Sequence, residues 1–469
     1  LGQAIELAAR YNPDYRMQVN DQNVADWSVV ESYFNLLPGV SVNSAFQYQA
    51  PGTPRIGLFS AEELGISRTP SYYYSTYGIG LGMQLSGATF FNIAQSRANR
   101  TATDARVVAA EYTLSSDVTR DYLTAMRSRD AVAVARQSLE SARESKRLAD
   151  ARVEAGAATP LDAAQAEVEA GRAEVALIQA ENLAETDKLR LLQRIGLNLD
   201  REVELTDTFA VFEPGWNIED LMKMALANHP QLRSARASEA AGVAAARAAK
   251  MSYLPTLNLS GGWGGSAREV GDNESVINSA KSRIENQRDN CDFNNRLASV
   301  LPGGIAGYPK DCSTFVFTPQ MEAEALAANN LFPFNFTASP PAFTASISFP
   351  IFDGFTRERQ MQQAKADADD AKQRRRAAEL SQQTQVATTH RNVIAAQRSV
   401  AIEQRNVQAA ETSLNLARER YRLGAGTFLE LTQAQQVKAE ADRAYLDAMY
   451  SFHENVAALE SAVGQRLRQ

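Results

Sequence analysis

Two stretches of this 469-residue chain contain neither glycine nor proline, and their length limits the fold severely. They lie between Gly87 and Gly156 and between Gly354 and Gly424, and both are rich in Ala, Glu, Gln, Arg and Leu. These residues are good helix formers, and about 65 helical residues span on the order of 100 Å. A second helical segment follows each stretch, so the sequence predicts two long helical hairpins, at 88–197 and 355–465.

The chain is internally duplicated. Asn12-Pro13 returns as His229-Pro230 at an offset of 217, and the segment that starts at Arg152 returns at Arg420, at an offset of 268. Such self-similarity marks repeated structural units. The predicted first repeat covers 1–217, with a leading helix at 1–36, strands at 38–49 and 72–86, the first hairpin, and a linker at 198–217. The predicted second repeat covers 218–469, with a leading helix at 218–252, strands at 255–264 and 342–350, an outward loop at 265–341, and the second hairpin.

A heptad spacing predicts how the long helices pack. Six apolar residues in the second hairpin fall seven apart, and four in the first do the same. They are Val386, Val393, Val400, Val407, Leu414 and Tyr421, and Val118, Ala125, Val132 and Leu139. A sustained spacing of seven keeps one seam against a neighbour only when the helices supercoil left-handed. We therefore expect coiled-coil packing against several neighbours.

The predicted strands alternate between apolar and polar or small residues. From Tyr77 to Ser86, every second residue is large and apolar, and the others are Gly, Gln or Ser. This pattern fits an antiparallel sheet that covers a soluble core, or a membrane β-barrel wall. The barrel is favoured because the strands are long enough to cross a bilayer and the long helices use their seams on one another. Four strands cannot close a barrel, so several chains must contribute, with the helices continuing the barrel axis.

Composition excludes some classes of function. A net charge of −7 argues against a nucleic-acid surface, and no apolar run approaches the length of a transmembrane helix. The chain starts directly in an amphipathic helix, so no signal peptide is visible. The three histidines lack metal-ligand spacing and no nucleophile–base pair stands out, so we expect no enzyme activity and no cofactor. Cys291 and Cys312 are candidates for a disulfide in an oxidising compartment, although two free thiols would also fit.

The order of elements, found twice, resembles the TolC family of outer-membrane efflux and secretion channels. The resemblance rests on the two X-Pro pairs, on Leu37-Pro38 and Leu254-Pro255 at the strand starts, on Ile351-Phe352-Asp353-Gly354, and on two Gly-x-x-Thr-x-Leu-Asp/Glu tips. It implies an α+β membrane protein: a homotrimer with a 12-stranded antiparallel β-barrel in the outer membrane of a Gram-negative-type bacterium, continued by a 12-helix α-barrel in the periplasm. It also implies a periplasmic adaptor, an inner-membrane transporter of RND, ABC or MFS type, and outer-membrane lipid as partners.

The hairpin tips are the best candidates for function. Thr159 with Asp162, and Thr427 with Glu430, have the spacing of helix-capping pairs. The resemblance makes Glu430 a gate residue, with Gln433 at a second gate position, Tyr421 matching a latch tyrosine, Asp162 matching an acid on the neighbouring hairpin, and Gly426 replacing a latch arginine. The residues expected to contact the adaptor are Arg152, Gly156, Thr159, Leu161, Arg420, Gly424, Thr427 and Leu429.

We therefore predict a passive exit duct of a tripartite pump or type I secretion system, which exports toxic small molecules or polypeptides and is gated at the tips. The alternative is a coiled-coil scaffold outside the membrane. A scaffold does not need four strands that are long enough to cross a bilayer and apolar on one face. The strands therefore favour the channel over the scaffold.

Overall fold

A computed structural model of the chain describes residues 1–53, 55–56, 59–60, 69–198 and 203–467. The chain divides into two compact units, and both repeats contribute to each. The helical unit comprises Leu1–Ser32, Phe91–Met251 and Gly354–Gln469, and the sheet unit comprises Tyr33–Phe90 and Ser252–Asp353. Among the described residues, no helix is both long and apolar enough to cross a membrane.

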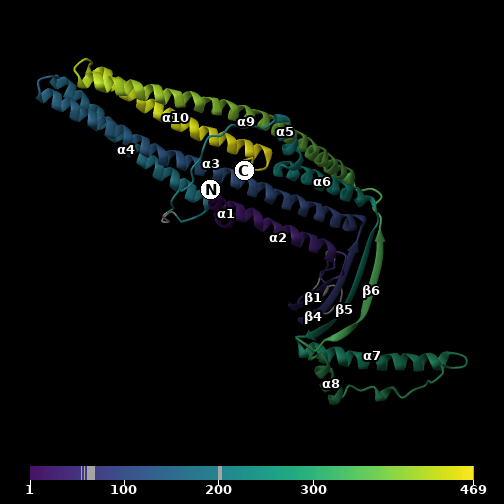
Figure 1. The fold of residues 1–469 in the computed structure, drawn as a ribbon. Helices are drawn as coiled ribbons and strands as arrows, with labels where there is room; N and C mark the ends of the chain where they lie inside the picture. The colour runs from purple at the N-terminus through teal and green to yellow at the C-terminus, as the bar shows by residue number, and fades with distance from the viewer. Residues whose placement is uncertain (54, 57–58, 61–68, 199–202, 468–469) are drawn as a thin grey trace. The chain divides into compact units, whose positions relative to one another are not determined.

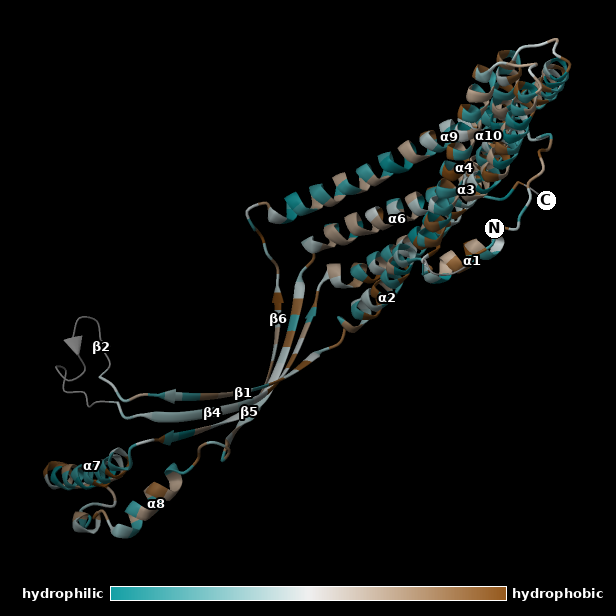
Figure 2. Ribbon diagram, turned by 90° about the vertical axis from the view of Figure 1, so that its left-hand side faces the viewer, coloured by the Kyte–Doolittle hydropathy of each residue, from teal (hydrophilic) through white to brown (hydrophobic). Residues whose placement is uncertain are grey.

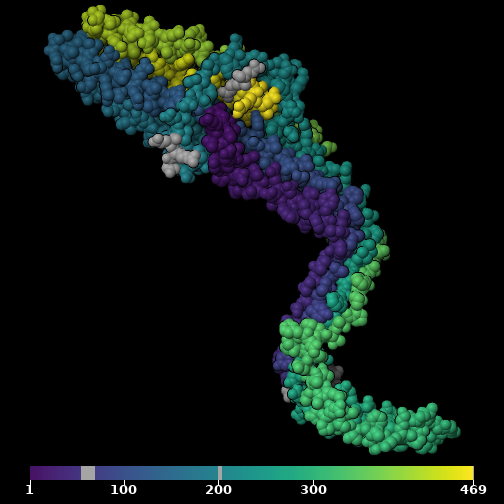
Figure 3. Space-filling model, turned by 60° about the horizontal axis from the view of Figure 1, so that its bottom comes forward, coloured from purple at the N-terminus to yellow at the C-terminus, as the bar shows by residue number. Residues whose placement is uncertain are grey.

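Four long helices form the two predicted hairpins of the helical unit (Figure 1). They are α3 (Gly87–Glu154), α4 (Pro160–Ile195), α9 (Thr356–Arg422) and α10 (Phe428–Val463). In Figure 3 the α3–α4 hairpin (blue) and the α9–α10 hairpin (yellow-green) lie side by side. α9 and α10 contain no glycine or proline, and α3 contains none after Gly87, which allows this uninterrupted length. In α4, Pro160 stands at the first helical position and Gly171 is the one internal glycine.

The heptad seams lie where the spacing predicts. Val386 and Val393 are buried in α9 and pack with Phe452, Val456 and Leu459 of α10. In α3, Val118 and Ala125 are buried with Leu191 of α4. Val407 and Val132 are only half-buried. The described part of the predicted linker contributes aromatic side chains to these cores, with the Phe212 ring 5.2 Å from that of Phe452.

Each predicted leading helix is in fact two helices. In the first repeat these are α1 (Gly2–Tyr11) and α2 (Pro13–Phe34), and in the second α5 (Ile218–Asn228) and α6 (Pro230–Lys250), followed by the 3-10 turn η1 (Met251–Tyr253). The break falls at Asn12 and at His229, both extended. A proline has no N–H and its ring disfavours a helical residue before it, so Asn12-Pro13 and His229-Pro230 end one helix and start the next.

The returning helices end against these breaks. Gly196 and Gly464, the C-caps of α4 and α10, both have φ of +85°. A Cβ at Gly196 would lie 2.4 Å from the carbonyl oxygen of Tyr11, and one at Gly464 would lie 3.0 Å from the Cα of His229. Glycine is therefore required at both positions by the left-handed backbone and by the close approach.

The sheet unit contains one four-stranded antiparallel sheet, in the order β1-β4-β5-β6. The strands are β1 (Gly39–Gln49), β4 (Tyr72–Leu85), β5 (Thr256–Val270) and β6 (Thr337–Ser348). A short hairpin of β2 (Arg55–Ile56) and β3 (Phe59–Ser60) lies between β1 and β4 in the chain. Figure 2 shows hydrophobic and hydrophilic residues interleaved along the four strands.

The strand register places the apolar residues on one common face. Val42 lies opposite Ile79, and Ile79 lies opposite Trp263. Leu257 lies opposite both Leu85 and Ile347. Because alternate residues of paired strands share a face, the alternation in the sequence produces a continuous apolar surface. Its side chains are largely exposed, since Val42 is 77% and Ile347 75% accessible.

The predicted outward loop at 265–341 is wrong in two respects. First, β5 continues to Val270, and β6 already begins at Thr337. Pro340 and Pro341, which lack the N–H that a ladder needs, fall at the register shift beside Gly262 and Gly264. Second, most of the remaining segment is helical, with α7 (Asn273–Val300), the 3-10 turn η2 (Cys312–Thr314) and α8 (Pro319–Asn329). These helices have little apolar periodicity, so the pattern did not reveal them.

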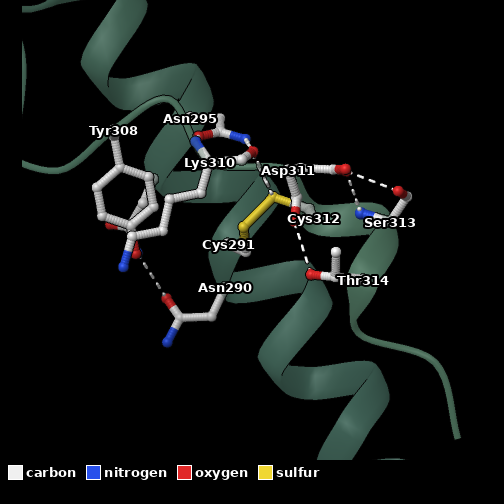
Figure 4. The surroundings of a disulfide bond; sticks show 10 residues. Asn290, Cys291, Asn295, Tyr308, Lys310, Asp311, Cys312, Ser313 and Thr314 are labelled. Carbon is white, nitrogen blue, oxygen red and sulfur yellow. Dashed lines mark hydrogen bonds between the residues drawn. A yellow bond between two sulfur atoms is a disulfide. The ribbon is translucent and has the colours of Figure 1, made fainter.

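The two cysteines join α7 to the segment that covers it (Figure 4). Cys291 and Cys312 form a disulfide and both are buried. Beside the disulfide, the amide of Asn295 donates to the carbonyl oxygen of Lys310 and accepts from its N–H, each at 2.8 Å. The disulfide and this pair of hydrogen bonds fix the covering segment against a helix that is otherwise polar.

Candidate functional site at the hairpin tips

The first tip is a fully formed capping box. Thr159 Oγ1 accepts the N–H of Asp162 at 3.3 Å, and the Asp162 carboxylate accepts the N–H of Thr159 at 3.0 Å. Pro160 follows at the first helical position, where its missing N–H costs nothing. Gly156, at φ +72°, turns the chain after α3. The carboxylate of Asp162 is therefore committed to its own helix end.

The second tip differs in one decisive contact. Thr427 Oγ1 accepts the N–H of Glu430 at 3.2 Å, but the Glu430 carboxylate lies 3.7 Å from the Arg420 guanidinium. Both side chains are about half exposed, 51% for Arg420 and 46% for Glu430. Glu430 is therefore the tip acid whose charge faces solvent, and Arg420 partly neutralises it. Gln433 is exposed one helical turn farther along α10.

Equivalent arginines act differently in the two tips. Each donates to the carbonyl oxygen five residues ahead, from Arg152 to Ala157 at 2.8 Å and from Arg420 to Ala425 at 3.1 Å. Arg152 also donates to the carbonyl oxygen of Tyr421, on the other hairpin, and its guanidinium carbon lies 4.4 Å from the Tyr421 ring centre. A guanidinium over an aromatic face makes a cation–π contact, so Arg152 joins the tips.

Tyr421 is the centre of the contact between the tips. It is buried in a cluster with Leu414, Phe428 and Leu431 of its own hairpin, and Ala149 and Ala166 of the other. Burial is the main reason that the pKa of its phenol is raised, with the Asp162 carboxylate adding to the rise and Arg152 opposing it. The structure thus brings Arg152, Asp162 and Tyr421 together, whereas Glu430 belongs to a separate pair with Arg420.

The expected docking residues lie at the ends of the hairpins. Leu161 and Leu429 hold equivalent places at the start of α4 and α10 and are exposed, at 63% and 59%. Gly156, Thr159, Gly424 and Thr427 are exposed, and Gly424, at φ +76°, turns the second tip as Gly156 turns the first. Each chain therefore presents two similar tips, each with a protruding leucine beside a capped helix start.

A set of polar contacts behind the tips was not predicted from the sequence. The Gln435 amide donates to Ser141 and Ser145 of α3, and Arg418 lies 3.2 Å from Ser141 Oγ and 3.5 Å from the Glu144 carboxylate. Ser141, Glu144, Arg418 and Gln435 line a cavity of about 600 Å³ between the hairpins. Lys438, also on this cavity, bonds both Glu411 and Asp442. Burial opposes the charge of Lys438, but the two carboxylates outweigh it and raise the pKa.

Comparison with known proteins decides the family. A family model described as "Outer membrane efflux protein" matches residues 4–197 and 316–465. The chain belongs to the outer membrane efflux protein family. It is accordingly a TolC-like efflux channel of the outer membrane, part of which extends into the periplasm. The internal range that the family model does not match, 198–315, includes α7 and both cysteines, Cys291 and Cys312.

Solved structures show the same fold at low sequence identity. The outer-membrane channel OprN is 19% identical, with a TM-score of 0.71 over 99% of this chain and 89% of that one. VceC from Vibrio cholerae is 16% identical, with a TM-score of 0.69 over 100% and 96%. The CmeC outer membrane channel of Campylobacter jejuni is 15% identical, with a TM-score of 0.71 over 100% and 87%. No individual curated protein sequence matched the chain significantly.

Proposed function

We propose that this efflux channel is the passive exit duct of a tripartite pump or type I secretion system, and that it works as a homotrimer. The observation that supports the homotrimer is the four-stranded sheet. It has an exposed apolar face and two edge strands, β1 and β6, of similar length. Unpaired edges are not tolerated in lipid, and four strands are too few to close a barrel. Three copies give a closed barrel of about twelve strands, with β1 of one copy beside β6 of the next.

The oligomeric state is tested by native mass spectrometry in a mild detergent. A closed trimer has three times the chain mass of 51.2 kDa. Cysteines placed in turn along β1 and β6 then check the junction, because Cys291 and Cys312 are already paired. We expect one set of β1–β6 positions to yield a crosslinked trimer. A monomer in detergent, or no crosslink at any position, would contradict the proposed barrel.

We further propose that the tips form the periplasmic gate. The Arg152–Tyr421 contact holds the two hairpins of one chain together, which favours the closed arrangement. Glu430 from three chains would surround the axis as a ring of negative charge, and such rings select cations. Gln433 would contribute a second, uncharged ring. The proposed gate therefore has two components. The Arg152–Tyr421 contact holds it closed, and the ring of Glu430 side chains selects cations.

The tips are also the proposed docking surface for a periplasmic adaptor, which links the duct to an inner-membrane transporter of RND, ABC or MFS type. The supporting observation is that both tips expose an equivalent leucine, so three chains would offer six similar sites. Crosslinking in native cells tests this. We expect Leu161→Asp and Leu429→Asp to lose crosslinks to the adaptor, while Leu380→Asp, at an exposed α9 position far from the tips, retains them. Equal crosslinking by all three variants would contradict docking at the tips.

The transporter would supply the energy and choose the cargo, either toxic small molecules or polypeptides. The coiled-coil scaffold, which was the alternative from the sequence, is disfavoured by the family match and by the outer-membrane localisation that it shows.

A further inference from the structure

A segment that precedes β6 crosses the apolar face of the sheet. We call residues 331–336 the aromatic strap; its sequence is Leu-Phe-Pro-Phe-Asn-Phe. Phe336 packs edge-on against Tyr77 of β4, with ring centres 4.7 Å apart, and the Phe332 ring centre lies 5.4 Å from that of Tyr73. Phe332 and Phe334 each lie 6.2 Å from Phe46 of β1. The strap therefore reaches from the β6 edge across β4 to the opposite edge strand.

Small residues make room for the strap. The apolar alternation of β4 is interrupted at Ser75, which lies opposite Ala267 of β5. Both residues are fully buried, although Tyr73, the neighbouring residue of β4 on this face, is exposed. Ser75 Oγ donates to the carbonyl oxygen of Pro333 at 2.6 Å. Ser75 therefore interrupts the apolar alternation at the position where it binds the strap.

Hydrogen bonds also hold the beginning of the strap. The Asn329 side chain accepts the N–H of Val270 and donates to its carbonyl oxygen, both at 2.8 Å. The Glu269 carboxylate accepts the N–H of Phe332 at 3.0 Å. Because backbone and side chains both take part, the strap is fixed to the end of β5 and does not merely rest on the sheet.

The strap produces a band of aromatic side chains that nothing else in the described residues covers. Phe334 is 73% exposed, and Phe46 and Tyr48 are each 57% exposed. Along the same face, toward the strand ends that lead to the helices, the exposed residues include aliphatic Val40, Val42 and Ile347. Aromatic side chains at the rim of an aliphatic band are typical of the membrane–water interface.

We propose that the aromatic strap is an anchor in the lipid interface, which sets the depth of the sheet's outer end in the outer leaflet. This inference rests on the proposed membrane-spanning sheet. The occupant is lipid because the strap continues the apolar face of the sheet, and because Tyr48 and Tyr73 combine an apolar ring with a hydroxyl, as interfacial positions favour. From Tyr73 to Leu85 the strand extends about 40 Å, or about 30 Å along the membrane normal at a 40° tilt, close to the hydrocarbon thickness.

Fluorescence quenching tests the anchor in the full-length protein. Because the native cysteines are paired, Phe334→Cys provides one free thiol for a bimane label in reconstituted vesicles. The quenchers are phosphatidylcholine with a nitroxide near the headgroup, the same lipid with the nitroxide deep in the acyl chain, and aqueous iodide. Val42→Cys, in the middle of the apolar face, is the control for the membrane, and Phe293→Cys, exposed on α7, is the control for water.

We expect the label at position 334 to be quenched at least about twofold more by the shallow nitroxide than by the deep one. The label at 42 should show the reverse, and the label at 293 should respond to iodide alone. If 334 behaves like 293 while 42 is still quenched by lipid, the anchor is wrong and the membrane-spanning sheet stands. If 334 escapes all three quenchers, a neighbouring subunit covers the strap and the anchor is again wrong. If 42 also escapes the lipid quenchers, the proposed function itself fails.

A second variant tests the attachment of the strap. Asn329→Ala removes both hydrogen bonds to Val270 but changes no apolar residue. Combined with the label at 334, it should lower the shallow-lipid quenching by about twofold, because the strap loses a fixed position. Unchanged quenching would show that these bonds do not hold the strap at the interface.

Discussion

The imidazole of His229 lies with Nε2 3.0 Å from the carbonyl oxygen of Ser461, near the end of α10. Its Nδ1 accepts the N–H of Gln231 at 3.2 Å and so caps α6. In the first repeat, the Asn12 amide donates to the carbonyl oxygen of Arg194 at 2.7 Å and accepts the N–H of Tyr15 at 2.9 Å. Asn12 and His229 therefore have the same structural role with different side chains. Each caps the start of the helix that follows it and contacts the C-terminal end of a returning long helix.

Because the second repeat has a histidine where the first has Asn12, we expect the contribution of His229 to stability to depend on pH. Burial lowers the pKa of His229 below 6.5, so the unfolded chain binds the proton more readily than the folded one. The stabilisation by neutral His229 is present above about pH 6.5 and is lost as the pH falls through the lower, folded pKa. Protonation also removes the acceptor that caps α6. We expect the apparent melting temperature, followed by circular dichroism, to fall between pH 7.5 and 5.

The matched control is His229→Asn, which copies Asn12. It should fold at pH 7.5 and lose part of the pH dependence, because an amide does not titrate in this range. An identical slope in the two proteins would contradict a role for His229.

Breaking the contact between the tips should open the gate. Arg152→Ala removes the guanidinium over the Tyr421 ring and the hydrogen bond to its carbonyl oxygen. A loss of about 1 kcal/mol corresponds to about a fivefold larger open fraction. Single-channel recording in planar bilayers measures this fraction. Arg152→Lys, which keeps the charge without the planar guanidinium, should have an intermediate open fraction. An open fraction equal to that of the unmodified channel in both variants would exclude the contact as a latch.

Charge at the second tip should control ion selectivity in both directions. Glu430→Ala should lower the preference for cations, because it removes the solvent-facing acid. Arg420→Ala should raise it, because it frees the Glu430 carboxylate from its partner. Reversal potentials in a salt gradient give the measurement. Asp162→Asn is the control and should leave selectivity unchanged, since that carboxylate is held in the first capping box; a shift there as large as in Glu430→Ala would refute the distinction.

The disulfide should stabilise the inserted helices and leave the long helices unaffected. Cys291 and Cys312 are 21 residues apart, and closing a loop of this size stabilises by about 3 kcal/mol. The double variant Cys291→Ala/Cys312→Ala should therefore exchange the amide hydrogens of α7 faster. Hydrogen-exchange mass spectrometry compares α7 with α9 in one experiment. Faster exchange in both helices, or in neither, would argue against a local effect.

The sequence by itself determined the long helices, their packing seams and the apolar face of the sheet. The length of the long helices follows from the two stretches without glycine and proline. The heptad seams and the apolar face of the sheet follow from residue spacing, because side chains three to four apart in a helix, or two apart in a strand, share a face. The X-Pro pairs and capping threonines also act locally, so their sites were visible, although the break within each leading helix was not predicted.

The tertiary structure decided which side chains from distant parts of the chain meet. Arg152 and Arg420 hold equivalent positions, yet one stacks on Tyr421 of the other hairpin and the other pairs with Glu430 in its own tip. Ser75 interrupts the strand pattern because the strap crosses there. Such contacts depend on how two segments approach in space, and residue spacing along the chain contains no record of that approach.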